Sequence, residues 1–407
     1  MQNVGDRGGM AVYIVGTADT KRAELEFLRE QFLSSGLRVL LVDVGTRSSE
    51  FEADIGPESV AAYHPRGTDI LKGDDRGTSI TEMGEALVLF LSSQSDLGGI
   101  IGIGGSGGTA LITPAMQALP IGTPKVMVST VASGDVSAYV GPTDICMLYS
   151  VTDMTGLNRI SVKVLTNAAA AMAGMMQVEH VQCLGTLLPA VGLSMFGVTT
   201  PLVSNLAEKL KTRFEPLVFH ATGIGGQSME RLVQEGELVA LLDMTTTEIA
   251  DLIVGGVLSA GPGRLDSVIK TKIPYIGSCG ALDMVNFGGI ETVPERFRER
   301  NLYAHNKFVT LMRTTADENR KIGIWIGNKL NQCEGPVRFA LPMGGVSAID
   351  APGGPFYDPE ADESLFEALE STIDPTPNRK IVRIDANIND PSFADAIEAM
   401  FDEIVSP

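Results

Sequence analysis

The sequence predicts an α/β protein made of two Rossmann-like subdomains, each with a parallel sheet, that face each other across a cleft. Three observations predict this fold. The chain has 407 residues, which suits two domains of ~150 residues or more. Short runs of β-branched residues alternate with longer segments of helical periodicity, as they do in βαβ units. Several stretches of the second half also repeat the order of strand, turn and helix found in the first.

The predicted strands are short apolar runs that end in turns of small residues. Between them lie amphipathic helices such as 20–34, in which Leu25, Leu28, Phe32 and Leu33 share one face. We expect strands at 11–15, 39–44, 99–103, 125–129 and 145–149 in the first subdomain, and at 192–196, 217–220, 239–243, 274–277, 322–326, 337–341 and 381–384 in the second.

The internal repeat indicates where one domain ends. It predicts an N-terminal Rossmann-like domain at 1–185 and a C-terminal Rossmann-like domain at 186–407, with the boundary after a helix at 167–177. The C-terminal domain would contact a substrate or a partner. The paired segments are 13–32 with 193–212, 41–46 with 218–226, and 123–135 with 272–283.

The charge balance excludes several classes of partner. Lys and Arg number 31 against 50 Asp and Glu, and the net charge of −19 repels nucleic-acid backbones and anionic membranes at long range. A local pocket of backbone N–H groups can still bind phosphate. No apolar stretch is typical of a membrane helix, and the first residues lack the apolar segment of a secretory signal. We therefore expect a cytoplasmic protein that binds neither nucleic acid nor membrane.

The four cysteines and four histidines show no spacing typical of a metal site. No two cysteines stand in a C-x-x-C pair, and no two histidines would share a helical face. We expect buried, reduced thiols and no structural zinc.

The strongest local signal is GGIIGIGGSGGTAL (98–111), an apolar strand that opens into a glycine loop and a helix. Three of its glycines have the spacing of a dinucleotide fingerprint. The next strand ends at Ser129 without the acidic residue that binds the ribose of NAD, which disfavours an NAD-dependent dehydrogenase. The loop also matches the spacing of a P-loop, but Gly108 stands where the phosphate-binding lysine is required.

Two loops could therefore contact a nucleotide through groups other than such a lysine. Residues 104–109 offer an anion nest of backbone N–H groups together with the hydroxyls of Ser106 and Thr109, or else only pack the helix on the sheet. In the loop 129–141, Asp135 could bind Mg²⁺ or cap a helix.

The segment GTADTK (16–21) follows the first strand, where open α/β sheets bind ligands. Lys21 could supply the positive charge that the glycine loop lacks. The alternative is that Asp19 or Thr20 is only a helix N-cap and Lys21 is solvated.

The second half contains three further candidates without an assigned role. HATGIGGQSME, around Thr222, offers another anion cradle. LLDMTTTEI presents Thr245 to Thr247 and then Glu248, which can form a capping box or line a polar pocket. Cys279 and His305 could form a nucleophile pair, but a buried thiol and an unrelated histidine is the preferred interpretation.

Several long strings, in fixed order, resemble a single family over nearly the whole chain from Met10 onward. It is the family of the tomato mosaic virus resistance protein's N-terminal ATP-binding domain. The strings are GTADTK (16–21), GIGGSGGT (102–109), LDMTTTEIADLIVGGVLSAGP (242–262), GSCGALDMVNFG (277–288), HNKFVTLMRTT (305–315), LPMGGVSAID (341–350) and GGPFYDPEAD (353–362).

This resemblance implies two Rossmann-like subdomains, ATP bound in the N-terminal one, and a homodimer. In the plant member this unit inhibits a viral replication protein. Carried over by position, the nucleotide site would comprise Thr17, Asp19, Thr20, Lys21, Gly104, Gly105, Ser106, Gly107, Gly108, Thr109, Ser129, Ser133, Gly134 and Asp135.

Two hypotheses for the function result. In the first, the chain is an ATP-binding enzyme of small-molecule metabolism that uses ATP with Mg²⁺, and the second domain supplies a substrate pocket. In the second, ATP regulates a non-catalytic binding dimer, as the role of the plant member suggests. No catalytic residue is assigned.

Overall fold

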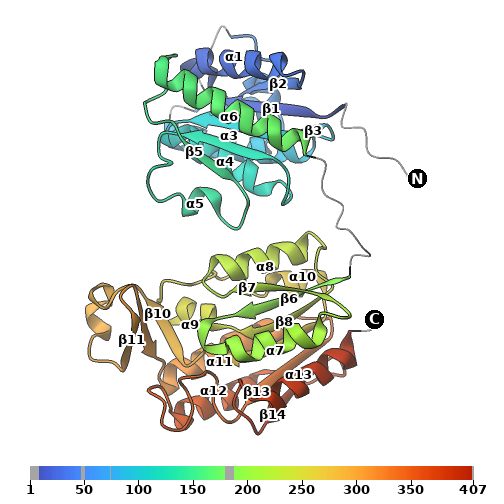
Figure 1. Cartoon of the computed structure of the whole chain (residues 1–407), viewed down its shortest axis with the longest axis vertical. Helices are drawn as coiled ribbons and strands as arrows, with labels where there is room; N and C mark the ends of the chain where they lie inside the picture. The colour runs from blue at the N-terminus through green and yellow to red at the C-terminus, as the bar shows by residue number, and fades with distance from the viewer. Residues whose placement is uncertain (1–8, 47–50, 74, 179–187, 406–407) are drawn as a thin grey trace. The chain divides into compact units, whose positions relative to one another are not determined.

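Two separate parallel sheets form the centres of the two units into which the chain divides, Met1–Leu184 and Gly185–Pro407. Figure 1 shows the first unit in blue to green and the second in green to red. Each is an α/β domain, which confirms the predicted fold class, and each is described by itself; the predicted cleft between them stays a prediction. The predicted boundary at residues 185 and 186 lies outside the described residues. In this computed structural model the described residues are 9–46, 51–73, 75–178 and 188–405.

The first sheet consists of β1 (Ala11–Gly16), β2 (Arg38–Asp43), β3 (Leu97–Gly104), β4 (Lys125–Ser129) and β5 (Cys146–Tyr149). All its strands are parallel, in the order β2-β1-β3-β4-β5. Strands β1 and β4 are buried at every position because helices cover both faces of the sheet.

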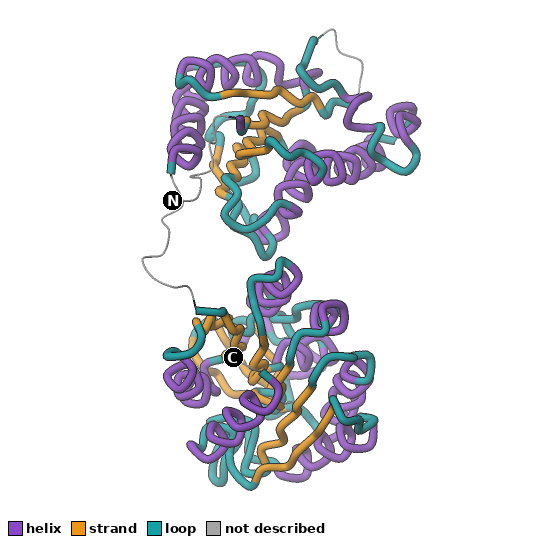
Figure 2. The backbone as a smooth tube through the Cα atoms, turned by 90° about the vertical axis from the view of Figure 1, so that its right-hand side faces the viewer, coloured by secondary structure: helices purple, strands orange, loops and turns teal. Residues whose placement is uncertain are grey.

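Helices α1 and α6 pack on one face of this sheet through Leu25 and Leu165, and α3 and α4 pack on the other through Leu87 and Leu111. Figure 2 shows the resulting layers, with helices in purple on both sides of the strands in orange. The helices of this unit are α1 (Ala18–Ser34), α2 (Pro57–Ala61), η2 (Gly67–Lys72), α3 (Arg76–Ser92), α4 (Ser106–Ala118), α5 (Ser137–Val140) and α6 (Arg159–Gln177).

The second parallel sheet consists of β6 (Ala190–Met195), β7 (Glu215–His220), β8 (Ala240–Thr245), β9 (Tyr275–Gly280), β13 (Val337–Pro342) and β14 (Arg379–Ile384). Their order is β14-β13-β9-β8-β6-β7. A small antiparallel sheet is inserted after β9, in the order β10-β12-β11, from β10 (Met284–Phe287), β11 (Leu302–Asn306) and β12 (Val309–Arg313). This antiparallel sheet was not predicted from the sequence.

Helices cover both faces of the second parallel sheet as well. Helices α7 and α13 pack on one face, and α8 to α12 contribute to the core on the other. The helices are η3 (Gly197–Thr199), α7 (Thr200–Leu210), α8 (Ile224–Gln234), α9 (Thr247–Val254), α10 (Asp266–Thr271), η4 (Ile290–Thr292), η5 (Glu295–Phe297), α11 (Ala316–Leu330), α12 (Pro359–Thr372) and α13 (Pro391–Ile404).

The predicted strand at 322–326 is wrong, because these residues lie inside α11. Ile322 and Ile326 are one helical turn apart and both buried, whereas Ile324 between them is 42% exposed. The local pattern of alternating isoleucines fits a strand equally well, but a capping box between Thr315 and Glu318 starts a helix upstream.

Both parallel sheets have the same topology. Numbered from the first strand of each unit, the order is 2-1-3-4-5 in both, with a sixth strand added at one edge of the second. The three segment pairs of the predicted repeat fall on equivalent strands: β1 with β6, β2 with β7, and β4 with β9. In this topology the order reverses beside the first strand, where open α/β sheets bind ligands at their carboxyl edge.

Candidate functional site

A cavity of about 320 Å³ lies at the carboxyl edge of the first sheet. The neighbouring strands β1 and β3 end here, and the chain leaves them toward opposite faces, to α1 and α4. This divergence opens the crevice that doubly wound sheets use for ligands. We call it the Arg76 cavity; it is lined by Thr17, Asp19, Thr20, Lys21, Thr46, Gly73, Arg76, Ser79, Ile80, Gly105, Ser106, Gly107, Gly108 and Leu111.

The first backbone amides of α4 lie at this cavity and lack hydrogen-bond acceptors among the described residues. Its N-cap Gly105 has no side chain to cap the helix, and its first turn holds no acidic residue. The amide of Thr109 donates to the Gly105 carbonyl, but among the described residues the amides of Ser106, Gly107 and Gly108 have no acceptor. The helix dipole adds partial positive charge at the same end. The loop can therefore bind an anion through its backbone alone.

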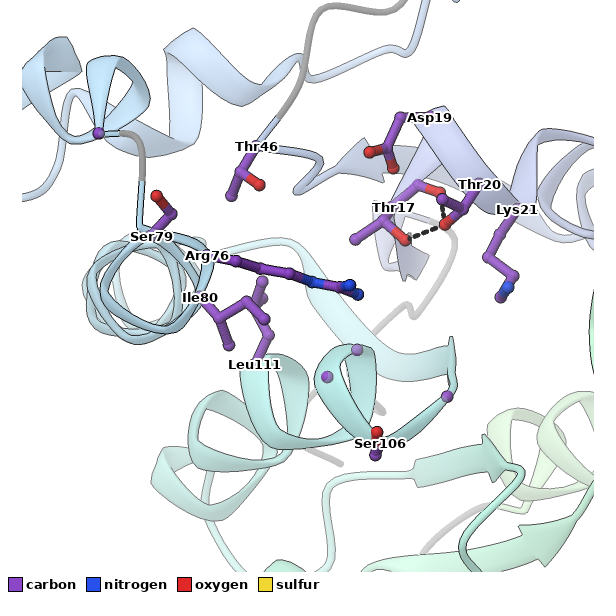
Figure 3. Close-up of a pocket in the computed structure, with 14 residues that line it drawn as sticks. Thr17, Asp19, Thr20, Lys21, Thr46, Arg76, Ser79, Ile80, Ser106 and Leu111 are labelled. Atoms are coloured by element: carbon purple, nitrogen blue, oxygen red, sulfur yellow. Dashed lines mark hydrogen bonds between the residues drawn. The ribbon is translucent and has the colours of Figure 1, made fainter.

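Arg76, which the sequence analysis did not single out, reaches into the cavity from the first turn of α3. Figure 3 shows its guanidinium between Thr17 and the start of α4 at Ser106. Its Nη2 lies 3.8 Å from the position that a β-carbon on Gly107 would occupy. Within the described part of the chain, Arg76 forms no ion pair or hydrogen bond. Its position in the sequence could have identified it, because an arginine in the first turn of a helix lies at the positive end of the helix dipole, where a cation is unfavourable.

Lys21 also lines the cavity, but its ammonium group has a partner. Nζ donates to the carbonyl oxygen of Met154 at 2.5 Å. The same loop is held to α1 by a second bond, from the amide of Gly156 to Oε1 of Glu24 at 2.8 Å. Lys21 thus connects α1 to the loop after β5, whereas Arg76 is the cation directed at the glycine loop.

The turn after β1 is held by a buried carboxylate from β2. Oδ1 of Asp43 accepts the amide of Ala18 at 2.9 Å, and burial raises the pKa of this carboxyl group. The predicted N-cap at Asp19 or Thr20 is wrong, because α1 starts at Ala18 and its N-cap is Thr17. The hydroxyls of Thr17 and Thr20 share a hydrogen bond of 2.8 Å at the cavity wall.

Three predicted site residues support the glycine loop without lining the cavity. Thr109 and Ser129 are buried, and their hydroxyl oxygens lie 2.6 Å apart. Thr109 also donates to the carbonyl of Gly105 at 2.8 Å. A β-carbon on Gly104 would lie 2.8 Å from the backbone of Gly108, so only glycine allows the loop to turn back so closely.

The third predicted segment of the site lies apart from the cavity. Ser133, Gly134 and Asp135 are exposed and do not line it. Oδ1 of Asp135 accepts a hydrogen bond from the amide of Ser137 at 2.9 Å, in a local turn before α5, whose N-cap is Val136 and not Asp135. The predicted residues that the structure brings together around the cavity are Thr17, Asp19, Thr20, Lys21, Gly105, Ser106, Gly107 and Gly108.

In the second unit, the glycine turn between β7 and α8 is filled by a side chain from α9. Oε1 of Glu248 accepts the amides of Gly223 at 2.7 Å and Gly226 at 3.0 Å. The anion cradle that the sequence predicted around Thr222 is thus present, but the carboxylate of Glu248 occupies it. The predicted capping box is wrong as well, since the N-cap Thr246 makes no side-chain cap bond.

Arg264 completes this closure. It is 2% exposed and contacts three carboxylates, with bonds of 3.0 Å to Glu248, 3.0 Å to Glu230 and 2.7 Å to Asp243. Burial lowers the pKa of Arg264, but the three carboxylates outweigh that effect and hold the pKa well above its usual value. Burial raises the pKa of Glu248. The network joins β8 to α8 and α9, and its role is structural.

The threonines beside this network form hydrogen bonds with other residues of the second domain. Oγ1 of Thr245 lies 2.7 Å from Oγ1 of Thr199, and Thr246 donates to the carbonyl of Ser278 at 3.0 Å. Both are fully buried, so they do not line a polar substrate pocket.

Cys279 and His305 do not form a nucleophile pair. Cys279 is buried in β9, where burial raises the pKa of its thiol, and His305 is exposed on β11. Cys183 and His180 lie outside the described residues. Among the described residues, no group of His, Cys, Asp and Glu side chains is arranged to hold a metal ion. In the same ranges, no helix is both long and apolar enough to cross a membrane.

Two family models match consecutive parts of the chain. Residues 10–181 match the N-terminal domain, and residues 188–405 the C-terminal domain, of the uncharacterised protein family UPF0261. The chain belongs to the UPF0261 family. A UPF0261 protein of Rhizobium meliloti (strain 1021) is 53% identical over 397 residues, which cover 97% of this chain and 99% of that protein. A UPF0261 protein of Clostridium tetani (strain Massachusetts / E88) is 46% identical over 95% of this chain and 96% of its own length.

The expected relation to the tomato protein is confirmed. The ToMV resistance protein Tm-1(GCR237) of Solanum lycopersicum is 44% identical over 420 residues, which cover 97% of this chain and 55% of that protein. Among solved structures, a UDP-N-acetylglucosamine 2-epimerase from Rickettsia bellii aligns with 66% of this chain and 78% of its own. The sequence identity is 12% and the TM-score is 0.23.

Proposed function

We propose that the Arg76 cavity binds the phosphate groups of ATP. The observation that carries the proposal is the convergence of two kinds of unpartnered donor on one cavity. The amides of Ser106, Gly107 and Gly108 and the guanidinium of Arg76 have no acceptor among the described residues. Groups of this kind at a helix N-terminus bind phosphate in many nucleotide-binding proteins. In a chain with a net charge of −19, such a concentration of donors favours a polyanion over a neutral ligand.

The cavity also fits a magnesium complex of the nucleotide. Asp19 is the only carboxylate among the described residues that line it, and the hydroxyls of Thr17 and Thr20 lie on the same wall. Magnesium in nucleotide sites commonly takes one or two protein carboxylates and completes its shell with phosphate oxygens and water. Asp19 would hold the ion, directly or through water, and the ion would offset part of the phosphate charge.

The glycine loop lacks one feature of a dinucleotide fingerprint. Strand β4, which follows the glycine loop and α4, ends at Ser129, and the hydroxyl of that residue is engaged with Thr109. No acidic residue stands there to bind the ribose of a dinucleotide in the usual way.

A second candidate is a nucleotide-dependent binding protein, active as a homodimer, in which ATP is held but not turned over. One observation favours it: the described residues that line the Arg76 cavity include no histidine or cysteine and one carboxylate, Asp19, which the magnesium ion would occupy. The name of the tomato relative, a resistance protein, points to a binding role rather than to a metabolic one.

The test is calorimetric titration of the whole chain with ATP, ADP, AMP and NAD, each with Mg²⁺. We expect affinity to fall in the order ATP, ADP, AMP, because each phosphate removed takes away contacts with the loop and with Arg76. NAD bound more tightly than ATP, or no binding of ATP at all, overturns the proposal. Phosphate release then separates the two candidates: turnover indicates an enzyme, and binding without turnover, with ATP-dependent dimerisation in sedimentation, indicates a regulator.

A further inference from the structure

A second and larger cavity adjoins the Arg76 cavity. It has a volume of about 570 Å³, within the range of small-molecule sites, and we call it the Asp43 cavity. Thr46 lines both cavities. The Asp43 cavity is lined by Asp43, Gly45, Thr46, Phe51, Glu52, Ala53, Gly56, Pro57, Glu58 and Leu71.

Gly45, which precedes the shared Thr46, lies near a carboxylate of each cavity. A β-carbon on this residue would lie 3.0 Å from Oδ1 of Asp43 and 3.5 Å from Oδ1 of Asp19. Asp19 lines the Arg76 cavity and Asp43 lines the other, so the absence of a side chain at Gly45 leaves the two carboxylates close together across the boundary. A ligand anchored in one cavity can therefore extend into the other.

The two cavities have opposite charge. Among the described residues, the lining of the Arg76 cavity has two cations and one carboxylate, whereas the lining of the Asp43 cavity has Asp43, Glu52 and Glu58 and no basic residue. A phosphate would be repelled from the second cavity. Its apolar walls, which include Phe51 and Leu71, suit a flat uncharged group instead.

One carboxylate oxygen of Asp43 has no hydrogen-bond partner among the described residues. The residue is 1% exposed, and its Oδ1 accepts the amides of Ala18 at 2.9 Å and Gly45 at 2.8 Å. Its Oδ2 receives no hydrogen bond from any described residue. Because Asp43 lines the cavity, its Oδ2 is available to accept a hydrogen bond from a ligand there. The raised pKa of Asp43, caused mainly by burial, agrees with a carboxylate that lacks such a donor.

We propose that the Asp43 cavity binds the nucleoside part of the nucleotide, with Oδ2 of Asp43 accepting a ribose hydroxyl and the apolar wall holding the base. This inference rests on the proposed phosphate site and makes the ligand a ribonucleotide. The division of charge orients the ligand, because only its phosphate end is compatible with the Arg76 cavity. Asp43 would then connect the nucleoside site with the phosphate site, because its Oδ1 accepts a hydrogen bond from the amide of Ala18 in the turn that follows β1.

The test compares four ligands by titration calorimetry with Mg²⁺: ATP, 2′-deoxy-ATP, 3′-deoxy-ATP and inorganic tripolyphosphate. We expect at least one deoxy analogue to bind about 10-fold or more weakly than ATP, the loss typical of a hydrogen bond to a charged group. Tripolyphosphate should bind more weakly than ATP. Equal affinity for ATP and both deoxy analogues, or for ATP and tripolyphosphate, overturns the nucleoside site and leaves the phosphate site standing. Binding of none of the four removes both proposals.

The variant Asp43→Asn tests whether Asp43 causes the preference for ATP over the deoxy analogue. Its amide oxygen can still accept the two backbone hydrogen bonds, whereas the second carboxylate oxygen is lost. We expect this variant to lose the preference for ATP over the deoxy analogue and to bind tripolyphosphate as the unmodified chain does. Asp54→Asn is the matched control: Asp54 accepts the amide of Leu41 in β2 in a similar way but lines neither cavity. A preference that survives Asp43→Asn overturns the assignment. Should that variant fail to fold, the four-ligand series on the unmodified chain still decides the proposal.

Discussion

The guanidinium of Arg76 and the α-carbon of Gly107 face the same small volume, with 3.8 Å between Nη2 and the position of a β-carbon on the glycine. Arg76 comes from the first turn of α3 and Gly107 from the first turn of α4, two helices that pack together on one face of the sheet. A phosphate that accepts the free amides of α4 therefore lies within reach of Arg76, and this geometry leads to the first two predictions.

Arg76→Ala should weaken ATP binding by about 10- to 100-fold, the effect expected for the loss of a charge-assisted contact. AMP binding should weaken less, because AMP has fewer phosphates for the arginine to contact. Lys21→Ala should have a smaller effect than Arg76→Ala, since the ammonium of Lys21 is engaged by the carbonyl of Met154. Titration calorimetry measures each affinity. Arg66→Ala removes a nearby arginine outside the cavity lining and serves as the control; a loss as large as that of Arg76→Ala would refute a specific role for Arg76.

Two glycine variants should separate binding from folding. Gly107→Val places carbon atoms in the cavity near Ile80 and Arg76, whose side chains can shift, so ATP affinity should fall while the melting temperature changes little. Gly104→Ala instead places a carbon 2.8 Å from the backbone of Gly108 and should lower the melting temperature by several degrees. Thermal unfolding and titration of both variants provide the measurements. Unchanged ATP binding by Gly107→Val would mean that the loop only packs the helix on the sheet.

Arg264→Met should be strongly destabilising, by about 3–5 kcal/mol, because it leaves the carboxylates of Glu230, Asp243 and Glu248 buried without their counter-ion. Urea unfolding of the unmodified and variant chains measures the difference. An exposed arginine supplies the control: Arg320→Met breaks a surface pair with Asp317 and should change stability by less than about 1 kcal/mol. Equal effects of the two substitutions would contradict the structural role of the buried network.

The stability of the second domain should fall as the pH rises from about 4 through neutrality. Burial raises the pKa of Asp251 to about 7, and burial together with the carboxylate of Asp350 raises the pKa of Asp283. The folded state therefore binds more protons than the unfolded state between a pH near 4, the usual carboxyl pKa, and these raised values. The corresponding stability is present at the acidic end of this window and is lost as these groups ionise.

Asp283→Asn tests this pH dependence. Oδ2 of Asp283 accepts the hydroxyl of Ser347, whereas Oδ1 is buried without a partner, so an amide fits the site without a charge. The variant should show a flatter melting temperature between pH 5 and 8, as measured by thermal unfolding across that range. A slope as steep as that of the unmodified chain would show that another group is responsible.

The fold class could be predicted from the sequence because strand and helix periodicities are local. Apolar runs such as 11–15 and 125–129 lie in buried parallel strands, and the glycine loop lies at the start of a helix, as its spacing indicates. The prediction for 322–326 was wrong for the same reason: its alternating isoleucines fit a strand, whereas the capping box upstream and packing against the core of the second domain favour the helix.

The sequence by itself determined two α/β halves with a repeated topology, and it placed a glycine loop and the GTADTK turn at the ends of strands. Which glycine turn is open was decided by the tertiary structure, because each cradle depends on side chains distant in the sequence. Glu248 reaches across 25 residues to fill the turn at Gly223, while nothing among the described residues fills the turn at Gly107. Arg76 became a candidate for the same reason, since its contact with that loop arises only when α3 packs beside α4.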